Sequence, residues 1–126
     1  MSERIAYTSE FPFNARPQLV YNYIATPSGL ATWFADDVNV NEDIFTFIWD
    51  GEEEKSRLVR SKRNELTRFE WIEREGDEYL EFRISQDELS GGITLTITDY
   101  EDADELEEAR MVMERLVESL RATIGG

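Results

Sequence analysis

Side-chain oxygens that could bind a metal ion or move a proton are concentrated in one short segment: Asp36, Asp37, Asn39, Asn41, Glu42 and Asp43. Calcium prefers several oxygen ligands from one loop, but this segment lacks the central glycine and the terminal glutamate of an EF-hand loop. Neighbouring side chains of an extended segment point to opposite sides, so Asp36 and Asp37 do not form an acid–base pair. We interpret the segment as a turn after a helix and predict no metal site.

Histidine and cysteine are both absent from the sequence. This excludes Ser-His-Asp and Cys-His catalysis, imidazole sites for zinc, iron or copper, and disulfide bonds. Catalysis would fall to carboxylates, tyrosine, lysine or arginine, and no position stands out as a buried ionisable group with a shifted pKa. We therefore predict no catalytic residue and no cofactor, and we expect a protein that is not an enzyme.

Large apolar residues of the predicted strands and of the predicted last helix form the best candidate for a ligand site. They are Phe45, Phe47, Trp49, Phe69, Trp71 and Phe82 from the strands, and Met113, Leu116, Val117 and Leu120 from the helix. Ligand pockets are mostly apolar with a few polar groups, for which Arg60 and Thr46 are candidates. The same residues could equally fill an ordinary core. The sequence leaves both alternatives open, and it does not determine which face of residues 44–49 points inward.

The charge of the chain restricts its partners. The chain has 13 Lys and Arg against 28 Asp and Glu, a formal net charge of −15, which repels nucleic acids and anionic membranes. The excess favours solubility, with docking on a basic protein as the alternative. The sequence shows neither the apolar run of a signal peptide nor that of a membrane span, so we predict a cytoplasmic protein without membrane insertion.

The N-terminal part of the chain predicts a strand followed by two short helices. Apolar residues alternate partly with polar ones over residues 4–13, which is typical of a strand. Pro17 suits a first helical position, and an apolar stripe follows it. Thr26 precedes Pro27, a pair that ends one helix and caps the next, which should reach Phe34.

The rest of the chain predicts strands and then one long helix. Asp50-Gly51 is a hairpin signal, and residues 55–62 are so charged that they indicate a solvated strand at a sheet edge. Ile93, Leu95 and Ile97 alternate with threonines, as in a strand with one buried face. Residues 103–124 have an amphipathic helical pattern with acidic residues at its start.

These elements give the order β-α-α-β6-α, and we predict one α+β domain over residues 1–126. An antiparallel sheet with one apolar face must bury that face, and the long amphipathic element available to cover it is the last helix. The sequence therefore predicts a curved antiparallel sheet whose concave side is covered by the C-terminal helix.

The segment from Glu10 to Tyr21, with the sequence EFPFNARPQLVY, is followed by Thr26-Pro27, Leu30, Trp33 and Phe34. It resembles the opening of START-like (SRPBCC) domains, and within them it is similar to the homologues of the activator of a chaperone ATPase. Residues 33–40 and 45–49 resemble a narrower bacterial group of START-like proteins whose role is undefined. For the remainder of the chain the resemblance lies in the order of the elements.

This resemblance implies a helix-grip fold with a cavity between sheet and helix that often holds an apolar ligand. Some relatives are cyclases or hydratases, others carry ligands, and the co-chaperone relatives act by protein contact, so the fold does not decide the function. We predict a non-catalytic domain that binds a small hydrophobic, lipid-like ligand. The alternatives are a protein-interaction module with a filled core and, third, a cyclase- or hydratase-like enzyme. The protein could be a monomer, or a homodimer formed through a sheet edge or the Trp33-Phe34 region.

Overall fold

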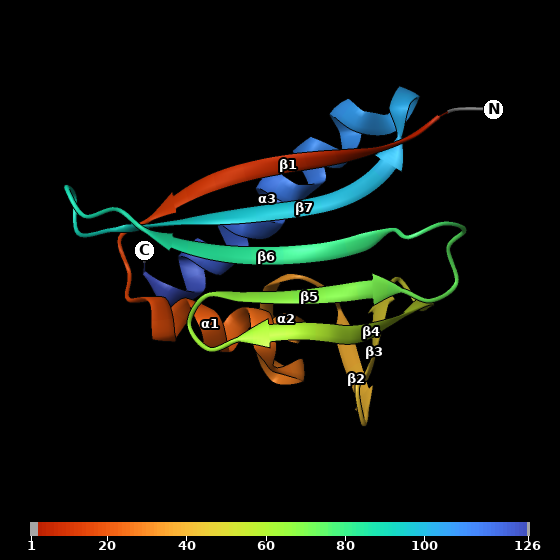
Figure 1. Ribbon diagram of the computed structural model, residues 1–126, viewed down its shortest axis with the longest axis horizontal. Coiled ribbons are helices and arrows are strands. Elements are labelled where there is room, and N and C mark those ends of the chain that lie inside the picture. The colour runs from red at the N-terminus through yellow and green to blue at the C-terminus, as the bar shows by residue number, and fades with distance from the viewer. Residues whose placement is uncertain (1–2, 126) are drawn as a thin grey trace.

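The computed structural model describes residues 3–125 of the chain, and within them seven antiparallel strands form one sheet. In chain order the elements are β1 (Arg4–Phe13), α1 (Pro17–Ala25), α2 (Pro27–Trp33), β2 (Asp37–Asn41), β3 (Ile44–Trp49), β4 (Glu52–Lys62), β5 (Leu66–Trp71), β6 (Tyr79–Gln86), β7 (Ile93–Asp102), the 3-10 turn η1 (Ala103–Glu105) and α3 (Leu106–Ile124). The strands lie in the order β1-β7-β6-β5-β4-β3-β2 (Figure 1). The predicted element order and the α+β class are confirmed.

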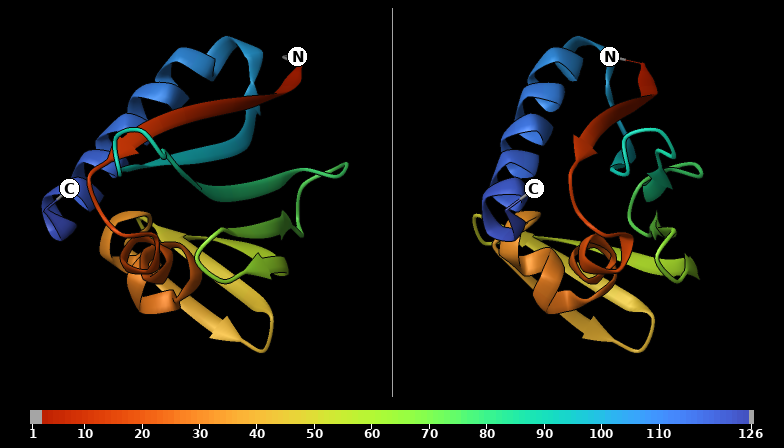
Figure 2. Two further views of the ribbon diagram at one scale, coloured as in Figure 1. Left: turned by 60° about the vertical axis from the view of Figure 1, so that its left-hand side comes forward. Right: turned by 90° about the vertical axis from the view of Figure 1, so that its left-hand side faces the viewer.

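The C-terminal helix lies along one side of the curved sheet, as the two views of Figure 2 show. Its buried residues Met113, Val117 and Leu120 belong to the hydrophobic core, and its C-terminal part approaches α1 and α2. The helix ends at Gly125, whose φ of 75° is a left-handed conformation that glycine adopts without strain. The predicted helix-grip arrangement is therefore present.

Two local signals of the sequence act as predicted. The Thr26 side chain accepts a hydrogen bond from the Gly29 N–H at 3.0 Å, which caps α2. Asp50 and Gly51 both have positive φ, 50° and 80°, which is the backbone of the type I′ turns that join tight hairpins. The first signal separates α1 from α2, and the second joins β3 to β4.

Strand alternation determines which side chains face the helix. Phe45 and Phe47 of β3 are buried, so the odd-numbered residues of this strand point inward. In β7 the same alternation buries Ile93, Leu95 and Ile97 and leaves the intervening threonines half-buried. The inward faces of the strands meet the buried face of α3 in a single core cluster.

Two arginines of α3 bind the backbone of β1, which is an edge strand of the sheet. Arg110 Nη1 donates to the Thr8 carbonyl at 3.1 Å, and Arg121 Nη1 donates to the Pro12 carbonyl at 2.7 Å. Unpaired carbonyls of an edge strand can pair with another chain, so these bonds both fix the helix and occupy the edge.

Two expectations about the surface are wrong. The charged segment predicted as an edge strand belongs to β4, which lies between β3 and β5 inside the sheet. It is charged because only one face of β4 is buried, through Ser56 and in part Leu58. Trp33 and Phe34 are 4% and 3% exposed, so they offer no surface to a second copy.

Among the described helices, none has the length and apolar character needed to cross a membrane.

Candidate functional site

A cleft of about 500 Å³ lies between α3 and the inward face of the sheet. Its apolar wall consists of Phe34, Trp49, Trp71, Val112, Met113 and Leu116. Phe34, Trp71 and Met113 are buried side chains, whereas Val112 is 43% exposed at the mouth. A rigid aromatic wall with an aliphatic helix face opposite can enclose the apolar part of a small molecule.

The ten apolar residues singled out from the sequence fall into two groups. Trp49, Trp71, Met113 and Leu116 line the cleft. The others are packed together in the hydrophobic core: Phe45, Phe47, Phe69, Phe82, Val117 and Leu120. The aromatic rings of the core contact one another edge to face, for example Phe34 and Phe82 with centroids 5.3 Å apart. The space between sheet and helix is thus filled in one part and hollow in another.

The polar partners proposed from the sequence lie elsewhere. Thr46 alternates with the inward residues Phe45 and Phe47 and therefore points to the opposite face of the sheet. Arg60 is exposed and follows the irregularity in the pairing of β4 with β5 between Leu58 and Arg60. Neither residue lines the cleft.

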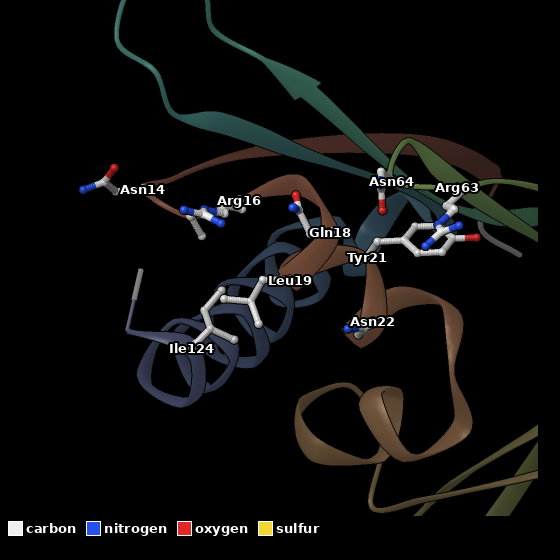
Figure 3. A pocket seen from close by; sticks show the side chains of 10 residues that line it. Asn14, Arg16, Gln18, Leu19, Tyr21, Asn22, Arg63, Asn64 and Ile124 are labelled. Atoms are coloured by element: carbon white, nitrogen blue, oxygen red, sulfur yellow. The ribbon is translucent and has the colours of Figure 1, made fainter.

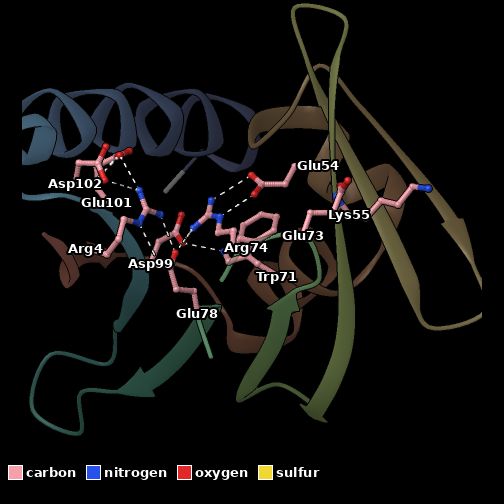
Figure 4. A network of polar contacts seen from close by, with 10 residues as sticks. All are labelled: Arg4, Glu54, Lys55, Trp71, Glu73, Arg74, Glu78, Asp99, Glu101 and Asp102. Atoms are coloured by element: carbon pink, nitrogen blue, oxygen red, sulfur yellow. Dashed lines mark hydrogen bonds and ion pairs between the residues drawn. The ribbon is translucent and has the colours of Figure 1, made fainter. Parts of the chain in front are cut away.

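Arg74, in the loop between β5 and β6, is the polar centre of the cleft (Figure 4). It binds both carboxylate oxygens of Glu54 at 2.7 and 3.1 Å, and its Nη1 lies 3.0 Å from Glu78 and 3.4 Å from Asp99. Burial opposes its charge, but these hydrogen bonds and charges raise the pKa of Arg74 above its ordinary value. Its guanidinium also lies over the ring of Trp71, 4.4 Å from the centroid.

Asp99 of β7 is a mostly buried carboxylate in the wall of the cleft. Its side chain is 14% exposed, and it accepts a hydrogen bond from Trp71 Nε1 at 3.0 Å. Burial raises the pKa of Asp99 to about 6, although the charge of Arg74 acts in the opposite direction. Tyr7 faces Asp99 across the β1–β7 pair, and burial together with the charges of Asp99 and Glu101 raises the pKa of Tyr7 to about 12.

Carboxylates crowd the mouth of the cleft near the start of α3. Glu101, Glu105 and Glu108 line it, and carboxylate oxygens of Glu101, Asp102 and Glu105 lie within 4.8 Å of one another. Arg4 lies 3.5 Å from Glu101 and 3.1 Å from Asp102. Its hydrogen bond with Glu78 lowers the pKa of that carboxyl. The mouth therefore carries a strongly negative potential on the α3 side.

A second hollow, of about 820 Å³, lies beside α1, the β4–β5 turn and the end of α3 (Figure 3). Most of its lining side chains are exposed, including Asn14, Arg16, Gln18, Asn22 and Arg63. Because a ligand gains little from walls that remain in water, the cleft under α3 is the better candidate.

Sequence reasoning missed the polar half of the cleft, although a signal for part of it was present. Continuing the alternation of Ile93, Leu95 and Ile97 places Asp99 and Glu101 on the same inward face. The position of Arg74 has no comparable signal, because it lies in a loop rich in charged residues. The sequence predicts no buried ionisable group, whereas Glu78 and Glu81 are buried and the side chain of Asp99 is only 14% exposed.

The sequence matches the family described as START-like superfamily domain over residues 1–126. The chain belongs to this superfamily. Among solved structures it is similar to the Aha1 dimer from Colwellia psychrerythraea, with a TM-score of 0.77 and 14% identity, covering 92% of each chain. It is also similar to MLL2253 from Mesorhizobium loti, with a TM-score of 0.79 and 12% identity, covering 96% of this chain and 97% of that one.

A third similar solved structure is DynU16, a protein of the dynemicin biosynthetic locus, with a TM-score of 0.80 and 13% identity. The match covers 95% of this chain but 47% of DynU16, so this chain spans about half of that protein. A comparison with curated proteins found no match. At such low identities these likenesses describe the fold, and the function has to be argued from the cleft.

Proposed function

We propose that this START-like protein is a non-catalytic cytoplasmic domain that binds a small molecule with a large apolar part in the cleft under α3. The observation that carries the proposal is the apolar wall of the cleft, in which Trp49 and Trp71 of the sheet face Val112 and Leu116 of the helix. A volume of about 500 Å³ falls in the range of small-molecule pockets.

The burial of apolar surface supplies the affinity. Each buried methylene group contributes roughly 0.8 kcal/mol, so a chain of a few carbon atoms is sufficient for measurable binding. Asp99 is held in the wall of the cleft by the indole N–H of Trp71 and by Arg74, and the proposal gives it this structural role.

The test uses the neutral dye N-phenyl-1-naphthylamine, whose fluorescence rises in an apolar site. The dye should bind the wild-type protein with one-to-one stoichiometry. Ala109 lines the cleft and Ala122 is an exposed residue near the end of the same helix, so they form a matched pair for substitution. Ala109→Trp should fill the cleft and abolish the dye signal, whereas Ala122→Trp should leave it unchanged.

Two outcomes would contradict the proposal. If the dye does not bind the folded wild-type protein, the cleft holds no apolar ligand, and the protein-interaction module predicted as the alternative is favoured. If Ala109→Trp and Ala122→Trp retain the dye equally, binding occurs elsewhere on the surface. If the dye binds as proposed, native mass spectrometry of freshly purified protein provides a second test. A retained cellular ligand should add a defined mass to the wild-type protein, and Ala109→Trp should remove it.

A further inference from the structure

The polar and apolar surfaces of the cleft are separated along α3. Glu105 and Glu108 line it at the start of the helix, and Val112, Met113 and Leu116 line it farther along. These positions recur at helical spacing, so they form one continuous face that changes from acidic to apolar. An occupant aligned with the helix would therefore meet carboxylates at one end and hydrocarbon at the other.

The charges of the cleft are unbalanced. Among the described residues that line it, one is a cation, Arg74, and the carboxylates are Glu54, Asp99, Glu101, Glu105 and Glu108. Glu54 engages Arg74 through both oxygens, and Glu78 and Asp99 also contact it. The charge of this guanidinium is therefore neutralised within the wall and is not available to an anionic ligand.

Among the described residues, two further cations lie near the mouth of the cleft, and neither contacts Glu105 or Glu108. Arg4 contacts Glu101 and Asp102, and Arg110 lies over the ring of Tyr7 at 5.5 Å and binds the Thr8 carbonyl. In the part of the chain that the structure describes, Glu105 and Glu108 make no ion pair. The charge of Glu101, with those of neighbouring carboxylates, raises the pKa of Glu105, which reflects mutual repulsion that a bound cation would relieve.

We propose that the ligand of this cleft is an amphipathic organic cation, with an ammonium group beside Glu105 and Glu108 and an apolar body against Trp49 and Leu116. This inference rests on the proposed function and specifies its ligand class. The aromatic wall suits such a ligand, because aromatic faces attract cations as well as hydrocarbon. Trp71 already shows this property, since the protein's own guanidinium of Arg74 lies over its ring.

The experiment compares three probes that share a ten-carbon chain and differ in the head group: decylammonium, decanol and decanoate. Each is titrated at neutral pH and below its micellar concentration against the protein loaded with N-phenyl-1-naphthylamine. Decylammonium should displace the dye at a concentration roughly tenfold or more below that of decanol, as a charge-assisted contact predicts. Decanoate should be weaker than decanol, and the preference for decylammonium should shrink as salt screens the carboxylates.

Matched variants locate the head group. Glu105→Gln/Glu108→Gln removes the two carboxylates of the cleft face, and Glu107→Gln/Glu114→Gln removes two exposed carboxylates of the same helix. Both variants change the net charge equally. The first should lower the affinity for decylammonium several-fold and leave that for decanol unchanged, whereas the second should change neither. Unchanged binding of decanol also shows that the variant is folded.

The outcomes separate the two proposals. If decanol or decanoate binds as tightly as decylammonium, the ligand is not a cation, while apolar binding in the cleft stands. Equal losses of decylammonium affinity in the two double variants would also overturn the inference, because the effect would then come from net charge. If neither the dye nor any probe binds the wild-type protein, the proposed function itself fails, and the inference fails with it.

Discussion

The guanidinium of Arg74 lies over the indole of Trp71 at 4.4 Å from the ring centroid, and both side chains line the cleft under α3. The two residues are also linked through Asp99, which accepts a hydrogen bond from Trp71 Nε1 and contacts Arg74. A loop between β5 and β6 thus supplies the cation that joins the aromatic wall of the cleft to its carboxylates. The polar half of the cleft depends on this one side chain.

Replacing Arg74 with glutamine should destabilise the protein by about 2–3 kcal/mol, because Glu54, Glu78 and Asp99 would lose a shared cation in a partly buried site. The measurement is urea denaturation at neutral pH, followed by tryptophan fluorescence. The difference in the free energy of unfolding between the variant and the wild type should become smaller at a pH low enough to protonate the three carboxyls. Their unpaired negative charge causes part of the destabilisation.

The control for this variant is Arg115→Gln, which removes an arginine that is exposed on α3. Its effect on the free energy of unfolding should stay within about 0.5 kcal/mol. Equal effects of the two substitutions would show that Arg74 acts only through the net charge of the protein and is not needed by its carboxylate partners.

The fold could be predicted from the sequence because its main signals are local. Thr26-Pro27 separates two helices through a side-chain cap, and Asp50-Gly51 accepts positive φ at both turn positions. These effects involve neighbouring residues, so the pattern of residue types contains them. The position of the charged strand β4 inside the sheet was missed, although its partners β3 and β5 are its neighbours along the chain. Its charges suggested an edge strand, but they belong to the face of β4 that is not buried.

Only the apolar part of the candidate site could be predicted from the sequence. Trp49 and Leu116 line the cleft, but a sequence does not show which apolar residues leave a hollow and which fill it. Arg74 reaches Glu54, which is 20 residues away, through a loop whose conformation no short motif specifies. Asp99 could have been found, because strand alternation places it on the buried face after Ile97.

The raised pKa of Asp99 predicts a specific dependence of stability on pH. Its pKa is about 6 in the folded protein and 3.8 as the ordinary value, so between these values the folded state holds a proton that the unfolded state has released. The contribution of this group to stability is therefore complete below about pH 4 and is lost as the pH rises through 6. At higher pH its ionisation costs the folded state on the order of 2–3 kcal/mol.

Asp99→Asn removes this titration and serves as the test. Relative to the wild type, the variant should gain about 1 kcal/mol in the free energy of unfolding when the pH is raised from 5 to 8. Comparison of the two proteins at each pH cancels the titration of all other carboxyls. The difference in the free energy of unfolding between the two proteins could instead stay constant with pH, or the wild type could gain stability relative to the variant. Either result would show that Asp99 is already ionised at pH 5.

The attachment of α3 to the edge of the sheet predicts the effect of replacing Arg121. This side chain donates to the Pro12 carbonyl at 2.7 Å and lies over the ring of Phe13 at 4.3 Å. Arg121→Gln should destabilise the protein by about 1–2 kcal/mol through loss of the hydrogen bond and the ring contact. Hydrogen exchange should show faster opening of the last turns of α3, with β3 and β4 unaffected.

Arg115→Gln again provides the control, because this exposed arginine lies on the same helix six residues earlier. Uniform acceleration of exchange over the whole domain in Arg121→Gln would contradict the prediction. It would mean that the end of α3 opens only with global unfolding, so that the contact with β1 has no local role.

Thr67 of β5 connects the sheet to the end of α1 through a buried hydrogen bond. Its hydroxyl donates to the Ile24 carbonyl at 2.9 Å, and Thr67 is fully buried. A carbonyl in the last turn of a helix has no partner within the helix, so Thr67 supplies the one that water would otherwise provide. Thr67→Val keeps the shape of the side chain and leaves that carbonyl unpaired, which should cost about 1–3 kcal/mol.

Thr96→Val is the matched control, because Thr96 alternates with the buried residues of β7 and faces the outer side of the sheet. It should change the free energy of unfolding by no more than about 0.5 kcal/mol in urea denaturation. If Thr67→Val were equally neutral, water or a shifted helix end would satisfy the Ile24 carbonyl. Packing of α1 and α2 alone would then hold this end of the core, which includes Phe34 of the cleft wall.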